Sequence, residues 1–215
     1  GIPVRQLRFE FGAREGRNPV WSKSSPDFAM FINALGVGIP HFERFLVRVM
    51  RTYRDDLQDK QLLEDVRAII GQESHHAFNF VRWTKELAWK YPEIVDRDHE
   101  ANRYFDQAFR TRSKKFQIGF TAGYETFTFL GGMIILNRYK ELMEHADPVL
   151  GGLWVWHQVE EVEHGAVAFD FFQAFYGKHE WYRRYMVVYA FCHIAKETFL
   201  AFGPMVKGEH YRGRR

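Results

Sequence analysis

The tetrapeptides Glu73-Ser74-His75-His76 and Glu161-Val162-Glu163-His164 decide the fold predicted for this chain. Each sets a Glu and a His three positions apart, and residues at that spacing share one face of an α-helix. A carboxylate and an imidazole on one face can point at the same metal ion. Apolar residues at helical spacing flank both units, so each is expected on the buried face of a long helix. Together the two units indicate metal ligands inside a helical bundle.

Two further carboxylates complete a four-helix pattern. Glu43 lies on the apolar face of a predicted helix, and Glu125 lies inside the very apolar stretch Ile118–Leu136. Ferritin-like di-metal proteins take one Glu from each of two helices and a Glu-x-x-His unit from each of the other two. The chain supplies these residues in the order Glu43, Glu73/His76, Glu125, Glu161/His164. The sequence therefore predicts an all-α, ferritin-like four-helix bundle with additional helices, over residues 1–215 as a single metal-binding domain.

Each part of this pattern has a plainer explanation when it is taken alone. A single Glu-x-x-His unit is common on helices, and Glu43 could pair with Arg44 or Arg48 at the surface. Glu125 is harder to explain, because an unpaired buried carboxylate is costly. The combination of all four elements on four helices favours the metal site.

A third histidine lies in the same stripe of the last of these helices. His157 precedes Glu161 by four residues, so it shares a face with Glu161 and His164. It is either a further ligand or a residue that supports the ligands from outside, and the sequence leaves both open. His75 points away from its stripe and is not expected to be a ligand. Glu160 and Glu163 also lie off the face, in a solvated or a supporting role.

The predicted centre holds two metal ions. Glu73 and Glu161 are expected to bridge the ions and to carry the catalytic role, with Glu43 and His76 on one ion. Glu125 and His164 would bind the other ion, with His157 as an additional ligand there. Two histidines and four carboxylates form an oxygen-rich environment that suits iron, with manganese as an option and zinc less well matched.

Composition excludes several classes of protein. The 215 residues are 46% hydrophobic and 27% charged, with a net charge of +3, which is too mild to indicate a nucleic-acid partner. The tail over residues 205–215 is basic but short, and we expect it to be solvated. The single cysteine, Cys192, excludes a disulfide within the chain, and its apolar neighbours predict that it is buried. No secretory signal pattern opens the sequence, so a reducing, cytoplasmic setting is expected.

The apolar stretch Ile118–Leu136 is nearly long enough to cross a bilayer. Glu125 near its middle would cost roughly 3 kcal/mol on membrane-insertion scales. A helix buried at the centre of a bundle is apolar all round in the same way. The stretch is therefore predicted to be a bundle helix, and no membrane span is expected.

Helix boundaries follow from proline, glycine and the apolar period. Residues 1–25 are expected to be irregular, and Gly36–Pro40 is expected to separate two short helices. The predicted helices are 26–35, 41–53, 59–90, one or two helices within 98–145 of which the second is 118–136, then 149–176 and 180–202.

Three blocks of sequence resemble a known family. They are Phe42-Glu43-Arg44-Phe45, Ile70-Gly71-Gln72-Glu73-Ser74-His75-His76, and the stretch from Trp156 to His164 followed by Ala166-Val167-Ala168-Phe169-Asp170. The chain is similar in these blocks to the bacterial predicted metal-dependent hydrolases, a ferritin-like family. In ligand spacing alone, the third block also resembles the di-iron arylamine N-oxygenases, in which an additional His precedes the last Glu-x-x-His by one turn.

Three functions are compatible with such a centre. The first is a non-haem di-iron (or Fe/Mn) oxidoreductase or oxygenase that activates O2, acts on a small organic substrate and needs an electron donor if it is an oxygenase. The alternative is a metal-dependent hydrolase, as the family description states. The third is an iron-binding or peroxide-scavenging protein. A homodimer is compatible with each of them.

Overall fold

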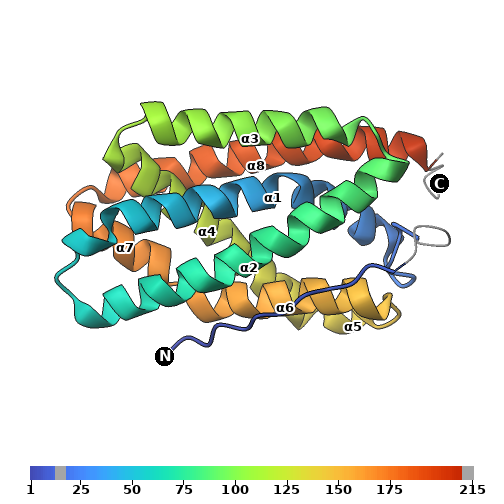
Figure 1. The fold of residues 1–215 in the computed structure, drawn as a ribbon, viewed down its shortest axis with the longest axis horizontal. Coiled ribbons are helices and arrows are strands. Elements are labelled where there is room, and N and C mark those ends of the chain that lie inside the picture. The colour runs from blue at the N-terminus through green and yellow to red at the C-terminus, as the bar shows by residue number, and fades with distance from the viewer. Residues whose placement is uncertain (13–17, 210–215) are drawn as a thin grey trace.

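The computed structural model describes residues 1–12 and 18–209, and these residues form an all-α fold (Figure 1). Apart from one isolated bridge between Ser22 and Ala146, no β-structure occurs within these two ranges. The helices are α1 (Pro26–Tyr53), a 3-10 turn η1 (Arg54–Asp56), α2 (Lys60–Lys90), α3 (Ile94–Thr111), α4 (Lys114–Asn137), α5 (Tyr139–Met143), α6 (Pro148–His164), α7 (Val167–Tyr176) and α8 (Glu180–Gly208). The predicted fold class is confirmed, and the arrangement is compatible with a ferritin-like bundle.

Four helices carry the predicted site, namely α1, α2, α4 and α6. Helix α1 packs along α2 and α8, and α4 packs against α6, α7 and α8. Helix α3 covers α1 and α8 from outside (Figure 1). Helices α1 and α4 therefore lie between other helices, while α2 and α6 close the site from one side.

Helix α1 is continuous from Pro26 to Tyr53, so the predicted break at Gly36–Pro40 is wrong. A proline inside a helix removes one hydrogen bond and favours a kink. Both halves of α1 are buried against the bundle, and this packing outweighs the local preference. Gly36 has a packing role, because a Cβ atom there would lie 3.2 Å from the ring of Trp154.

Two other predicted boundaries are wrong. The helix expected over residues 149–176 is divided into α6 and α7 by a turn at Gly165 and Ala166, directly after His164. Gly165 lets the ring of Phe129 lie where a larger residue would carry its Cβ atom. Helix α8 continues past Pro204 to Gly208, because Ala201 and Met205 are buried in the apolar core.

The apolar core consists of two clusters with the predicted site between them. One cluster contains Trp83, Trp154 and Met205, and the other contains Phe45, Phe120 and Met186. On α1, α2 and α4, the predicted site residues fall where the helix passes from one cluster to the other. On α6 they follow the first cluster, and the second cluster continues at Val167 on α7. A polar layer thus crosses an otherwise apolar interior.

The contact between α4 and α8 requires a glycine, and this gives a first testable expectation. A Cβ atom on Gly123 would lie 2.5 Å from the backbone oxygen of Met186, which cannot move aside like a side-chain tip. We expect Gly123→Ala to destabilise the fold by about 1–3 kcal/mol through overpacking. Chemical denaturation measures the change. Gly131→Ala on the same helix meets nothing within 4 Å and should be neutral or stabilising, so equal losses in both variants would contradict the packing argument.

Helix α8 differs from the sequence prediction in its exposure. Cys192 is exposed, so the prediction of a buried thiol is wrong. Residues 205–208 belong to α8, while residues 210–215 of the predicted tail lie outside the described residues. In the described part of the chain, α8 is the one helix long and apolar enough to cross a membrane by length and composition, and 22% of its apolar window is buried.

Candidate metal centre

The structure brings all seven predicted site residues together in two groups that share one carboxylate. Glu43, His76, His157 and Glu161 form the first group, and Glu73, Glu125, Glu161 and His164 form the second. Within each group, one ligand atom per residue lies within 4.8 Å of the others. The seven side chains are 0–2% exposed. Glu161 belongs to both groups and is the geometric centre of the cluster.

In the first group, two imidazoles face two carboxylates. His157 Nε2 lies 3.2 Å from Glu43 Oε1 and 3.1 Å from Glu161 Oε1. His76 Nδ1 lies 3.9 Å from Glu43 Oε1 and 3.6 Å from Glu161 Oε1. The His76 and His157 rings meet edge to face, with centroids 4.6 Å apart. Three helices, α1, α2 and α6, supply these four residues.

In the second group, one imidazole faces three carboxylates. His164 Nε2 lies 3.2 Å from Glu73 Oε1, 3.2 Å from Glu125 Oε2 and 3.4 Å from Glu161 Oε2. Helices α2, α4 and α6 supply these residues. The Glu-x-x-His unit of α6 therefore meets the Glu of α2 and the Glu of α4 at one point.

Several inward-facing atoms of the cluster are buried and have no hydrogen-bond partner. They are Glu43 Oε2, both oxygens of Glu73, His76 Nδ1, Glu125 Oε2, Glu161 Oε2 and His164 Nε2. A buried polar atom without a partner is costly, and so many in one place call for an explanation. Two divalent cations would give these atoms partners and would neutralise the four carboxylates. The residues present therefore fit a pair of metal ions.

Two of the histidines have their ring protons fixed on the side away from the cluster. His76 Nε2 lies 2.9 Å from Glu160 Oε2, and His164 Nδ1 lies 2.8 Å from Gln72 Oε1. Both partners are acceptors, so each ring donates outward and turns its other nitrogen inward, where it can bind a metal ion once it carries no proton. This is the arrangement that metal-binding histidines adopt, with an outer acceptor that holds the tautomer and the ring orientation.

His157 differs from the other two histidines in its hydrogen bonding, and it lies in a different ligand group from the one predicted. It lies with Glu43 and His76, whereas the sequence assignment joined it to Glu125 and His164. Its Nδ1 accepts from Gln158 Nε2 at 2.8 Å, which leaves the ring proton on Nε2, facing Glu43 and Glu161. In this arrangement His157 donates to two carboxylates. Binding of a metal ion at Nε2 would require that proton to leave.

Burial and mutual repulsion determine the protonation of the carboxylates. Burial raises the pKa values of Glu43 and Glu73 well above the usual range and also raises the pKa of Glu125. Burial acts on Glu161 in the same direction, but the facing His157 and His164 outweigh it and hold its pKa well below the usual range. Burial lowers the pKa of His157 and His164, yet the attraction of Glu161 leaves both pKa values raised. Without metal, Glu161 is the carboxylate most favoured to be ionised.

These shifts predict how the stability of the metal-free protein depends on pH. A group whose pKa is raised by folding contributes stability below its unfolded pKa and loses it as the pH rises through the folded value. Glu43, Glu73, Glu125, His157 and His164 all fall in this class, while Glu161 and the neighbouring Glu160, whose pKa values are lowered, oppose them. We expect the chelator-treated protein to melt at a lower temperature at about pH 8 than at about pH 5.5. Thermal unfolding with excess chelator tests this, and metal addition should reverse the order.

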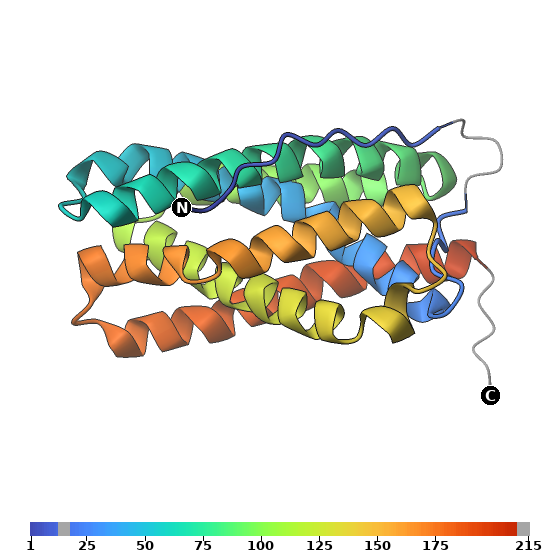
Figure 2. The same cartoon turned by 90° about the horizontal axis from the view of Figure 1, so that it is seen from below.

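The histidine partners are tied to the N-terminal strap, which we define as residues 2–11. In the strap, Arg5 donates to Glu160 at 3.0 Å and to Glu163 at 2.7 Å, and Glu160 is fully buried against His76. Gln72, the partner of His164, also donates to the backbone oxygen of Pro3 at 2.8 Å. The strap runs alongside α2 and α6 (Figure 2).

Helix α2 fixes the strap through side chains on one of its faces. Asn79 accepts from the Phe9 amide at 3.1 Å and donates to the Leu7 carbonyl at 3.0 Å, and Arg82 donates to the Phe9 carbonyl. The sequence analysis did not identify Arg5 and Gln72 as parts of the site. It gave Glu160 either a solvated or a supporting role, and the solvated role is wrong because Glu160 is buried against His76. No local signal marks Arg5, because its partner Glu160 lies 155 positions away in the chain.

The fold and the site define an all-α protein with buried histidine and glutamate clusters that can hold metal ions. The profile of the family described as predicted metal-dependent hydrolases matches residues 3–212, and the chain belongs to this family. Comparisons with curated proteins and with solved structures give no match.

Proposed function

We propose that this chain is a di-metal enzyme in which Glu161 would help to hold both ions. The observation that carries the proposal is the membership of Glu161 in both ligand groups, with one further carboxylate in the first group and two in the second. Glu43 and His76 would bind one ion, and Glu125 and His164 would bind the other. Glu73, which the sequence predicts to serve both ions, lies 3.4 Å from His76 Nδ1 and 3.2 Å from His164 Nε2, beside both histidines. His157 would either complete the first ion or donate to its carboxylates.

We further propose iron as the resident metal and O2 activation as the chemistry, on a small organic substrate and with an external electron donor. Four carboxylates against three histidines favour iron or manganese over zinc, whose catalytic sites keep three protein ligands and a water. When bound, a pair of redox-active ions supplies the electrons that reduce O2. The 0–2% exposure of the seven side chains also suits a very small co-substrate.

The protein residues would support this chemistry in distinct ways. Glu160 and Gln72 hold the rings of His76 and His164 with their second nitrogens turned inward. The apolar clusters on either side exclude bulk water, which strengthens every electrostatic interaction in the layer between them. The proton on His157 Nε2 faces Glu43 and Glu161, where it can move with a change in the charge of the site.

Hydrolysis is the second candidate, and the family description favours it over the oxidoreductase. A hydrolase would use the metal to activate water for attack on an ester or amide. Such a reaction needs neither O2 nor an electron donor, so the two candidates differ in their requirements.

Metal content and oxygen consumption on one preparation separate the candidates. The full chain is loaded with Fe(II) without air, desalted, analysed for iron and then exposed to O2, with Glu161→Gln as the control. The oxidoreductase proposal expects about two irons per chain, O2 uptake and a new near-ultraviolet absorption band, all lost in the control. A chain that retains zinc against iron, consumes no O2 and cleaves ester substrates in sealed anaerobic assays would reject it in favour of the hydrolase.

A further inference from the structure

The outward side of α8 carries a stripe of large apolar side chains. Trp181, Tyr185, Val188 and Phe199 are 80%, 58%, 61% and 66% exposed. The positions 181, 185, 188, 192, 195 and 199 alternate steps of four and three residues. This is the heptad spacing of a helix that pairs with another helix along its length. The opposite side of α8 is buried in the bundle, so the stripe has no partner in the described part of the chain.

Helix α4 extends the stripe sideways. The rings of Phe127 and Phe191 lie 5.3 Å apart and join the two helices at the surface. Leu130 and Ile134 follow Phe127 at helical spacing and are also exposed. Figure 2 shows α4 and α8 side by side. We call this continuous surface, the α8 stripe with its α4 neighbours, the α4/α8 face.

The α4/α8 face is large for a monomer. A fully exposed aromatic side chain offers roughly 150–250 Å², so the fractional exposures on this face correspond to an apolar area on the order of 800 Å². The largest apolar patch of a typical monomer is roughly 300–600 Å². One side of a standard protein interface buries about 800 Å². The face therefore has the size of half an interface.

The charges beside the stripe favour a protein partner over a membrane. Arg183 and Arg184 share Glu180, at 2.6 and 3.1 Å, and Lys196 is paired with Glu197 at 3.1 Å. Cations that are already paired offer little attraction to anionic lipid, which interfacial helices need on their polar flanks. Spanning a bilayer would also pull Met186, Ala190 and Met205 out of the core.

We propose that the α4/α8 face binds the same face of a second copy of this chain, so that two α8 helices pair across a two-fold axis. A surface that is apolar and heptad-spaced, with its flanking charges in ion pairs, is complementary to itself, which a two-fold interface requires. We place the two-fold axis perpendicular to α8, so that the two copies of the helix pair antiparallel and the middle of the stripe lies nearest the axis. Cys192 occupies that middle and is exposed. This proposal is independent of the metal chemistry.

The test uses the full chain, with Val188→Glu on the stripe and Trp89→Glu as a matched control. Trp89 is 63% exposed and lies on α2, so it is outside the α4/α8 face. Light scattering after gel filtration should give a dimer for the wild type and for Trp89→Glu at about 10 μM. Val188→Glu should raise the dissociation constant roughly 30-fold or more by burying an unpaired charge at the centre of the interface. Circular dichroism and thermal unfolding show that each variant is folded.

Cys192 provides a second readout, because it is the only cysteine of the chain. A short bis-maleimide should join two wild-type chains through Cys192, and the product should be absent in Val188→Glu and in Cys192→Ser. A wild type that is monomeric at 10 μM would overturn the proposal. A dimer unaffected by Val188→Glu, or one that is not cross-linked, would place the interface elsewhere and also overturn it. Monomer that co-sediments with phosphatidylserine vesicles would make the face a membrane surface instead.

Discussion

Glu161→Gln is expected to lose both metal ions at once. Glu161 is the single residue in both ligand groups, and its pKa lies well below the usual range, so it supplies the most readily available negative charge. Gln keeps the shape of Glu and removes that charge. Loss of a residue that only hydrogen-bonds to a metal ligand already lowers the metal affinity about 10–100-fold. For the shared ligand itself we expect about 100-fold or more, with less than one ion per chain after desalting, measured by elemental analysis.

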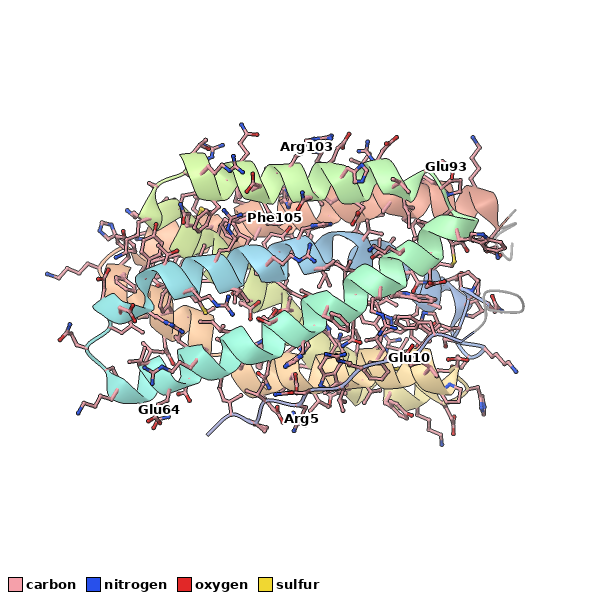
Figure 3. The ribbon with its side chains drawn as sticks, in the orientation of Figure 1. Arg5, Glu10, Glu64, Glu93, Arg103 and Phe105 are labelled. Atoms are coloured by element: carbon pink, nitrogen blue, oxygen red, sulfur yellow. The ribbon has the colours of Figure 1, made fainter. Side chains whose placement is uncertain are left out.

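Thermal unfolding gives an independent measure of the same change. A ligand at 100 times its dissociation constant stabilises the folded state by about 2.7 kcal/mol, so metal should raise the melting temperature of the wild type. Added metal should leave the melting temperature of Glu161→Gln nearly unchanged. The matched control is Glu64→Gln, the same substitution at an exposed position of α2 (Figure 3). If Glu161→Gln retained two ions with wild-type affinity, the shared-ligand geometry would be wrong.

Arg5→Gln is expected to weaken metal binding although Arg5 touches no predicted ligand. Its guanidinium pairs with Glu160, and Glu160 holds the ring of His76. Without Arg5, a buried carboxylate beside His76 loses its permanent countercharge, and the pKa of Glu160, which its partners keep low, should rise. A protonated or displaced Glu160 no longer orients His76. We expect about a 10–100-fold loss of affinity, concentrated on the ion at His76, with metal titration as the measurement.

Arg8→Gln is the control for this change. Arg8 lies three residues further along the same strap and is exposed, with its guanidinium 5.2 Å from the ring of Phe78. Figure 3 shows Arg5 and Glu10 along the strap, at the α6 side of the bundle. The measurement specific to positioning is the ratio between the affinities of one variant for the first and for the second metal ion. A general loss of stability would lower both affinities and leave this ratio unchanged. Equal affinities in Arg5→Gln and Arg8→Gln would contradict a role of the strap in the metal centre.

The sequence by itself determined the fold class and the set of residues that meet. This information is local, because a carboxylate and an imidazole three residues apart share a helix face in any helix. The apolar period around Glu73 and Glu161 predicts that both side chains are buried, and the apolar stretch around Glu125 predicts the same for it. Neither prediction needs knowledge of the neighbouring helices. The same local rules failed at Pro40 and Pro204, where tertiary burial outweighs a preference of a few kcal/mol.

The tertiary structure alone decided how residues of different helices are grouped. The spacing within α6 sets His157 beside Glu161, whereas helix rotation and offset bring Glu43 and His76 to it, and no spacing within α6 encodes those two neighbours. The same holds for the strap, where Arg5 reaches Glu160 across 155 positions. It also holds for Cys192, which lies with Val188 and Phe191 on the exposed side of α8. The period of the helix determines which residues lie on the same face. Only the packing of the helices decides whether that face contacts protein, metal or solvent.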